Sequence, residues 1–144
     1  MTSFSHDPSS FAWPVRVYYE DTDAGGVVYY ANYLRFLERA RTEWLRNKGV
    51  EQTDLLARHR LVFVVSQIHL DYLKPARFNE LLSVRVLVAS VGRASLEFRQ
   101  TIENNGVECV RAQVKVVCVD SVSFRPSRIP HELIQLIESG EHGH

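Results

Sequence analysis

A single long helical pattern, followed by a run of strand patterns, constrains the fold of this chain more than any other feature. From about residue 31 to residue 47, apolar side chains recur every three or four positions, as on one face of a helix. Alternating apolar residues predict a short strand before this helix and four long strands after it. This order predicts an α+β domain in which the one long helix covers one face of an antiparallel sheet of about five strands.

Local signals divide the rest of the chain. The first strand, residues 13–19, should place Val15, Val17 and Tyr19 on one face. A short second helix is predicted from Thr53 to Arg58 and a third after Pro130, because proline suits the first turn of a helix. Further turns are indicated by Lys48-Gly49 after the long helix and by the hairpin signal Asn104-Asn105-Gly106.

The strand predicted from residue 61 to residue 73 begins with an unusual apolar run. Residues 61–65 are apolar at both odd and even positions, which is typical of a strand that is covered on both faces. One long helix can cover only one face of a sheet. We therefore expect a second subunit to cover this strand, which predicts a homodimer or a dimer of dimers.

Length and charge limit the classes of function. The 144 residues suit one domain, and we divide them into a lead-in of residues 1–12, a single domain of residues 13–138 and a tail of residues 139–144. The 17 Lys and Arg residues balance the 17 Asp and Glu residues, so no net field attracts nucleic acid. Neither a membrane-spanning stretch nor a signal peptide is recognisable, which predicts a cytoplasmic protein. Cys109 and Cys118 are expected to be free thiols, and no metal site is predicted.

The loop between the first strand and the long helix carries the strongest indication of chemistry. It combines Asp21, Asp23 and two glycines with the apolar and aromatic run Val27-Val28-Tyr29-Tyr30. A polar turn would account for the two carboxylates alone, but not for valines and tyrosines beside them. We therefore predict an apolar pocket that contains a carboxylate beside the N–H groups of a helix N-terminus. This combination suits attack on an activated carbonyl, with the N–H groups stabilising the oxyanion.

A thioester fits this pocket best among acyl compounds. A thiol, with a pKa near about 8.5, leaves as a thiolate without a strong general acid, and the loop supplies no obvious proton donor for an amide. Asp23 is the predicted nucleophile or general base. Val27, Val28 and Tyr29, together with residues of a partner subunit, are expected to hold the acyl group. Ser66 is expected either to touch this group or to be a buried hydroxyl bonded to the backbone.

The sequence of this loop resembles a known family signature. Residues 18–33, Tyr-Tyr-Glu-Asp-Thr-Asp-Ala-Gly-Gly-Val-Val-Tyr-Tyr-Ala-Asn-Tyr, followed by Phe-Leu-Glu-Arg-Ala-Arg, resemble the signature of the 4-hydroxybenzoyl-CoA thioesterase family. Within that family the match is closest to the Tol-Pal system-associated acyl-CoA thioesterase branch. The similarity runs from Trp13 to about Glu138, including residues 72–77 and 117–120.

This resemblance implies the hotdog fold, with active sites at a dimer interface. It also implies that Asp23 is catalytic and that the backbone N–H of Tyr30 helps to form the oxyanion site. Members of the Tol-Pal branch commonly carry His at the position of Tyr30, so a role for an imidazole is not transferred. Arg93 matches a region where relatives bind coenzyme A phosphates, and solvated surface charge is the alternative role for it. A wider basic rim would comprise Lys74, Arg77, Arg125 and Arg128.

Together these observations predict an acyl-CoA thioesterase that releases a free carboxylic acid and coenzyme A. Coenzyme A enters as part of the substrate, and no separate cofactor is expected. The alternative is a non-catalytic module that binds acyl carrier protein or an envelope-biogenesis partner. A hotdog dehydratase is a weaker alternative, because it requires an Asp and His pair that the sequence does not place together.

Overall fold

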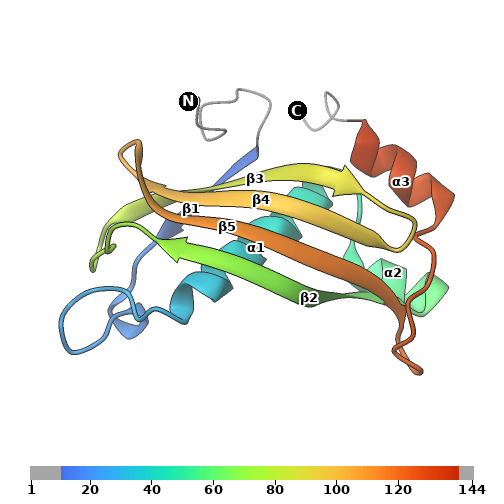
Figure 1. The fold of residues 1–144 in the computed structure, drawn as a ribbon, viewed down its shortest axis with the longest axis horizontal. Helices are drawn as coiled ribbons and strands as arrows, with labels where there is room; N and C mark the ends of the chain where they lie inside the picture. The colour runs from blue at the N-terminus through green and yellow to red at the C-terminus, as the bar shows by residue number, and fades with distance from the viewer. Residues whose placement is uncertain (1–10, 140–144) are drawn as a thin grey trace.

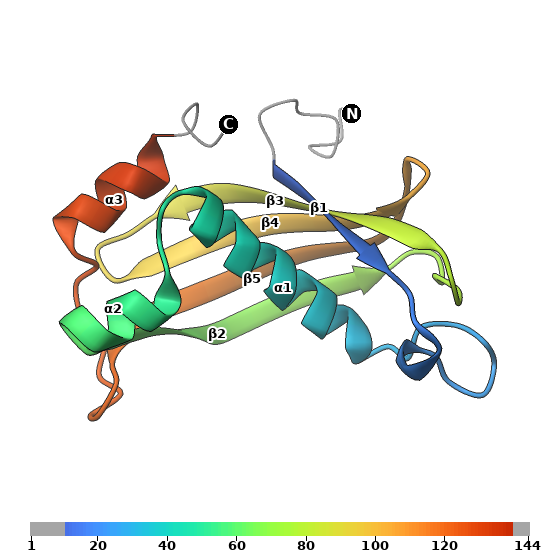
Figure 2. The same cartoon turned by 180° about the vertical axis from the view of Figure 1, so that it is seen from behind.

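One long helix lies across a five-stranded antiparallel sheet (Figures 1 and 2). The computed structural model describes residues 11–139; most of the expected lead-in and tail lies outside this range. The strand order in the sheet is β1-β3-β4-β5-β2. The strands are β1 (Phe11–Arg16), β2 (Leu61–Tyr72), β3 (Leu81–Val91), β4 (Ser95–Asn104) and β5 (Val107–Asp120). The helices are α1 (Asn32–Asn47), α2 (Gln52–His59) and α3 (His131–Glu138), with a short 3₁₀ turn, η2, at Tyr19–Asp21. The predicted α+β architecture is confirmed.

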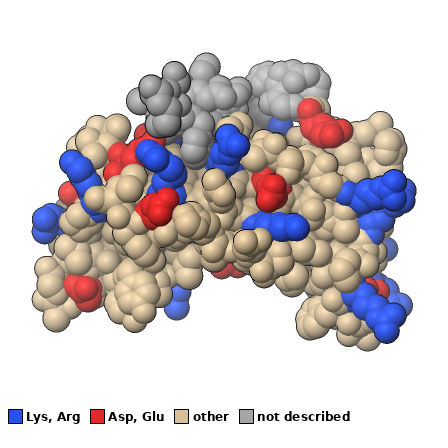
Figure 3. Space-filling view, in the orientation of Figure 1, with Lys and Arg blue, Asp and Glu red and all other residues tan. Residues whose placement is uncertain are grey.

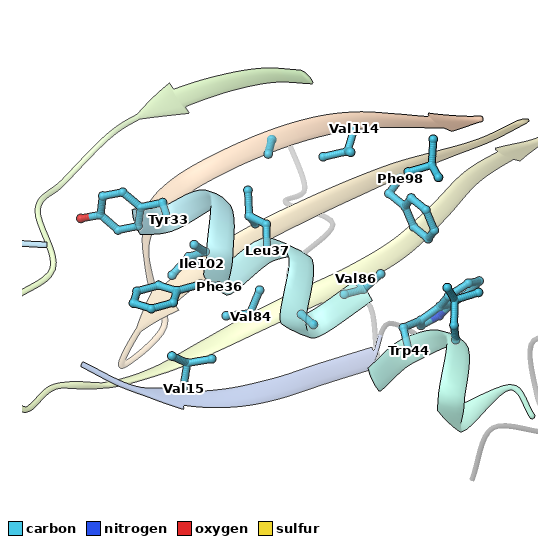
Figure 4. Packing of buried hydrophobic residues seen from close by; sticks show 14 of the residues in the cluster. Val15, Tyr33, Phe36, Leu37, Trp44, Val84, Val86, Phe98, Ile102 and Val114 are labelled. Atoms are coloured by element: carbon cyan, nitrogen blue, oxygen red, sulfur yellow. The ribbon is translucent and has the colours of Figure 1, made fainter. Parts of the chain in front are cut away.

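The central helix α1 packs on one face of the sheet, behind it in Figure 1 and in front of it in Figure 2. Most of its predicted apolar stripe is buried, and Phe36 and Leu37 are fully enclosed, but Leu34 at the edge of the stripe is 41% exposed. The ring of Trp44 meets that of Phe98 on β4 edge to face, with 5.3 Å between centroids. Figure 4 shows this stripe facing side chains from β3, β4 and β5. Because each fully buried large side chain contributes about 1.5–3 kcal/mol, this contact holds the helix on the sheet.

The hairpin between β4 and β5 has the predicted turn. Asn104 pairs with Val107, and the two residues between them, Asn105 and Gly106, have φ angles of 51° and 82°. Asn and Gly tolerate this left-handed conformation, and its twist matches that of the flanking strands. The local sequence therefore sets the conformation of the turn, whereas an irregularity between Ile102 and Glu103 shifts the register of the strands beyond it.

The start of the chain departs from the prediction. β1 covers Phe11–Arg16 rather than residues 13–19, and the chain then turns into η2. Val15 and Val17 are buried as expected, but Tyr19 is 80% exposed, so its predicted place on the same face was wrong. The alternation of apolar residues continues beyond the end of β1, because such a pattern does not distinguish a strand from the 3₁₀ turn that follows it. The second helix, Gln52–His59, extends slightly beyond the predicted range at both ends.

Both cysteines are free, as predicted, and the structure shows that both are buried. Burial raises the pKa of the Cys118 thiol to about 11. Among residues 11–139, no helix is long and apolar enough to cross a membrane. Figure 3 shows acidic and basic side chains interspersed over the face of the sheet that α1 leaves open, in keeping with the balanced charge of the chain.

Candidate active site

The loop between β1 and α1 is anchored by Asp21. This carboxylate is 7% exposed and accepts hydrogen bonds from the backbone N–H of Tyr18 (2.8 Å) and from Nδ2 of Asn32 (2.6 Å). The backbone carbonyl of Asp21 also accepts the N–H of Tyr29 at 2.9 Å. Asp21 therefore ties the beginning of the loop to the first residue of α1, which is a structural role.

Asp23 lies in a tight turn that leaves part of its carboxylate unoccupied. Its backbone N–H donates to the carbonyl of Val27 at 2.9 Å, and its carbonyl accepts the N–H of Gly26 at 3.0 Å. Oδ1 accepts the N–H of Gly25 at 2.8 Å, whereas Oδ2 accepts no hydrogen bond from the described residues. Gly26 has φ +81°, so the turn requires a residue that tolerates this conformation. The exposed Asp23 carboxylate thus keeps one oxygen available for a ligand or water.

Unpaired backbone donors lie just before the helix. α1 begins at Asn32, and its N–H donates to the carbonyl of Tyr29 at 2.8 Å. Within the described part of the chain, the N–H groups of Tyr30 and Ala31 have no acceptor. Free N–H groups at a helix N-terminus bind anionic oxygens. The structure therefore has donors at the position predicted for oxyanion stabilisation.

A hollow of about 280 Å³ opens beside these donors. Three tyrosines form its walls, with centroids 5.7 Å apart for Tyr33 and Tyr72 and 6.3 Å apart for Tyr30 and Tyr72. The Tyr72 hydroxyl donates to the carbonyl of Tyr30 at 3.1 Å, and the Tyr33 hydroxyl accepts the N–H of Ala76 at 3.0 Å. These bonds join the end of β2 to the helix start and so fix the hollow. The remaining lining residues are Val28, Leu73, Lys74 and Pro75.

The phenols around this loop are held in their neutral form. Burial raises the pKa of Tyr33 and that of Tyr72. A hydrogen bond with the Tyr30 side chain raises the pKa of Tyr29. Among the residues that the structure describes, Lys74 is the one lining residue of an acidic or basic type. A hollow with these walls suits an apolar group better than a charged one.

Residues 17–137 match the family model described as the thioesterase-like superfamily. The chain belongs to this superfamily. It is 46% identical over 125 residues to the acyl-CoA thioesterase YbgC of Haemophilus influenzae. The alignment covers 87% of this chain and 92% of that protein. It is also 46% identical to the acyl-CoA thioester hydrolase YbgC of Escherichia coli O6:H1, over 86% of this chain and 92% of that protein.

Solved structures agree with this membership of the thioesterase-like superfamily. A probable thioesterase from Bartonella henselae superposes with a TM-score of 0.81 and 32% identity, over 84% of this chain and 99% of that one. A 1,4-dihydroxy-2-naphthoyl-CoA thioesterase from Synechocystis, 21% identical, has the same fold with a TM-score of 0.84 over 92% of this chain and 98% of that one. The predicted family resemblance, the hotdog fold and the thioester hydrolase class are confirmed.

Within this thioesterase-like chain, the predicted site residues do not all lie together. Val28 and Tyr30 line the hollow. Val27 pairs with Arg77 beside it, and the exposed Tyr29 packs its ring against Tyr30 with centroids 4.8 Å apart. Asp23 lies in the same loop but outside the lining. The loop therefore gathers the catalytic candidates and three of the five predicted substrate contacts.

Ser66 and Arg93 lie elsewhere in the chain. Ser66 occupies an irregularity in β2 between Val65 and Gln67, where its hydroxyl is exposed rather than buried and lies 3.4 Å from the carbonyl of Lys115. Arg93 follows β3, whereas the loop adjoins the other end of that strand, because Arg16 pairs with Leu81. The eleven residues of β3 span about 33 Å, so one subunit holds Arg93 far from Asp23 (Figure 1).

The sequence did not identify some of the residues that line the hollow beside the Asp23 loop. Tyr72, Leu73 and Pro75 were not assigned to a site, and Lys74 was predicted only as part of a basic rim. Residues 72–77 do belong to the family resemblance, which is a signal that they matter. Their approach to the loop depends on tertiary structure, because β2 ends 40 residues after Asn32. No group of three potential metal ligands occurs in residues 11–139.

Proposed function

We propose that this protein hydrolyses acyl-CoA thioesters to a free carboxylic acid and coenzyme A, with Asp23 as the catalytic carboxylate. The observation that carries the proposal is the combination, in one loop, of a free Asp23 oxygen and the unpaired N–H of Tyr30. Tyr30 lines a hollow with apolar and phenolic walls, and Asp23 lies in the same loop outside that lining. The names of the YbgC relatives, acyl-CoA thioesterase and acyl-CoA thioester hydrolase, support the choice of substrate.

In the proposed reaction, the thioester carbonyl oxygen accepts the N–H of Tyr30. Negative charge that develops on this oxygen is stabilised there, an interaction whose loss costs roughly 3–4 kcal/mol in comparable sites. Asp23 either attacks the carbonyl carbon, forming an anhydride that water then hydrolyses, or removes a proton from an attacking water. In both routes the carbon–sulfur bond breaks and coenzyme A leaves as a thiolate. A strong general acid is unnecessary, because the thiol pKa is near about 8.5.

We propose further that the active form is a homodimer paired along β2. This strand is an edge of the sheet and exposes Val64, Val65 and Ile68. A second copy can pair antiparallel to it about a two-fold axis, which gives both strands their missing partner. Such pairing places the far end of one subunit beside the loop of the other. Arg93 would then reach coenzyme A phosphates from the partner subunit, and Ser66 would lie at the interface.

The test of this function is thiol release from a panel of acyl-CoAs by wild type and Asp23→Asn. The substitution keeps the side-chain volume and removes the charge, so kcat should fall by about a thousandfold or more if Asp23 is the nucleophile or base. Glu20→Gln is the matched control, since Glu20 is an exposed carboxylate in η2. Full activity in a folded Asp23→Asn dimer would exclude the proposed mechanism.

The same panel separates hydrolysis from binding alone. If a folded wild-type dimer releases no thiol from any acyl-CoA, the pocket must serve acyl carrier protein or an envelope-biogenesis partner instead. The proposal includes a cytoplasmic location, and a link to the Tol-Pal system follows from the branch that the sequence resembles. Fractionation of cells that express the tagged protein would test the location directly.

A further inference from the structure

A second hollow of about 280 Å³ lies between α1 and β2, away from the Asp23 loop. Most of its wall is apolar, with Phe63 and Val65 from β2, Phe98 from β4 and Val116 from β5. One buried cation, the guanidinium of Arg41 on α1, also lines it. The hollow therefore combines space for a hydrocarbon chain with one buried cation, and the exposed carboxylate of Glu38 also belongs to its lining.

Arg41 is held in place by a buried amide. The residue is 9% exposed, and its Nη1 donates to Oε1 of Gln100 at 3.0 Å. Gln100 is fully buried, and its Nε2 donates to the backbone carbonyl of Leu37 at 3.0 Å. Both polar atoms of the Gln100 amide are therefore hydrogen-bonded, one to the Arg41 guanidinium and the other to the backbone of α1. This arrangement positions Arg41 without neutralising its charge.

Most of the hydrogen-bonding capacity of Arg41 is unused. A guanidinium has five N–H donors, and among the described residues Arg41 makes only the hydrogen bond to Gln100. Burial lowers its pKa, although the ordinary value is so high that the group stays charged at neutral pH. Glu38, one turn earlier and also at the hollow, acts on this charge through space without a hydrogen bond. A buried charge in this state favours an anionic ligand.

A carboxylate is the anion that best fits these surroundings. It can accept two parallel N–H bonds from one guanidinium. A larger, multiply charged phosphate would meet the apolar walls and the nearby Glu38 carboxylate. We propose that this hollow binds the far end of the acyl group and that Arg41 selects acyl groups with a terminal carboxylate, which are monothioesters of dicarboxylic acids. This inference rests on the proposed thioesterase function and dimer.

The proposed dimer explains how such a chain would arrive. Arg41 is nine residues after the first residue of α1, about 14 Å along the helix, so the loop of its own subunit is distant. Antiparallel pairing of two β2 strands places the end that carries Tyr72 beside the partner's Phe63 and Val65. The tyrosine-lined hollow of one subunit then adjoins the Arg41 hollow of the other. A chain attached at the first would extend into the second.

The experiment compares kcat/KM for matched pairs of substrates of equal chain length: succinyl-, glutaryl-, adipyl- and suberyl-CoA against butyryl-, valeryl-, hexanoyl- and octanoyl-CoA. In wild type, one pair should favour the terminal carboxylate by about ten- to hundredfold, as expected for a charge-assisted hydrogen bond. Arg41→Met should abolish this preference. Arg35→Met, at an exposed arginine on the same helix that lines none of the described hollows, is the control and should retain it.

A second variant tests the same inference in case Arg41→Met does not fold. Glu38→Gln removes the nearest negative charge at an exposed position, so it should increase the preference by a few-fold. A ratio near one for every pair in wild type, or an unchanged ratio in both variants, would overturn the inference.

A binding measurement distinguishes failure of the proposed carboxylate site from failure of the proposed thioesterase function. Free adipate and suberate should raise the melting temperature of the wild-type dimer more than hexanoate and octanoate do, and Arg41→Met should remove this difference. If no acyl-CoA is hydrolysed but this difference is found, the thioesterase mechanism fails and the carboxylate site stands. If acyl-CoAs are hydrolysed without any preference or shift, the carboxylate site fails and the thioesterase function stands.

Discussion

The two edges of the sheet differ in how they are protected from pairing. β1 has six residues and contains Pro14, which has no N–H to offer. β2 has twelve residues and no proline, and it exposes Val64, Val65 and Ile68. Short strands and prolines are common devices that prevent edge-to-edge association. The comparison indicates that β1 is protected from pairing with another strand and that β2 lacks these protections.

The edges also differ in what lies beside them. The residue that ends β2, Tyr72, lines the hollow next to the Asp23 loop, whereas Phe63 and Val65 near its start line the hollow with Arg41. In the proposed dimer, pairing along β2 would bring together two pockets that one chain keeps apart.

The largest expected effect comes from a charge in the middle of β2. Ile68→Lys places an ammonium where the proposed interface is apolar, once in each subunit. Since a buried unpaired polar group costs about 1–3 kcal/mol, the two together should raise the dimer Kd by about a hundredfold or more. Sedimentation over a dilution series would measure this, with thiol release falling in parallel. Ala12→Lys on β1 should leave the dimer intact, and equal effects at both edges would break the comparison.

A mixed dimer tests whether a residue of one subunit contributes to the site of the other subunit across the β2 edge. Asp23→Asn and Arg93→Glu subunits, carrying different tags, would be co-expressed and the mixed dimer purified. If Arg93 serves the partner's site, one of the two sites contains both wild-type residues, so the mixed dimer should have about half of wild-type activity. Each variant homodimer should be much weaker than this. Activity no greater than the average of the two homodimers would place Arg93 outside the partner's site.

The smallest expected effect concerns the turn that joins β4 and β5, two strands that are not edges of the sheet. Gly106→Ala forces a side chain into the left-handed turn between β4 and β5, where space is open and only the backbone conformation opposes it. The free energy of unfolding should fall by about 1–2 kcal/mol, as measured by urea denaturation, with no change in the dimer Kd. A changed dimer Kd would show that pairing at the edge depends on this hairpin.

Features set by neighbouring residues could be predicted well. The stripe of α1 follows from its apolar spacing, and the β4–β5 turn follows from Asn105 and Gly106. The Asp23 loop was recognisable because carboxylates, glycines and tyrosines are close together in the sequence. The end of β1 was mistaken because the alternation of Val15, Val17 and Tyr19 continues after the strand has stopped.

Features that join distant segments could not be predicted in the same way. The hydrogen bond from Tyr72 to the carbonyl of Tyr30 joins residues 42 apart, and that from Arg41 to Gln100 joins residues 59 apart. In the sequence, Arg41 is one of several arginines of the long helix, and Gln100 is a polar residue between Phe98 and Ile102 on one face of a strand. Only their contact shows a buried cation with unused donors.

By itself, the sequence determined the order of the elements, the turn conformations, the family and the residue types in the Asp23 loop. These depend on interactions within a few residues and on a local motif. The tertiary structure decided that β2 is an open edge, that Tyr72 completes the hollow and that Arg93 lies far from Asp23. Strand order and register decide these matters, because they bring together residues whose spacing in the chain carries no periodic signal.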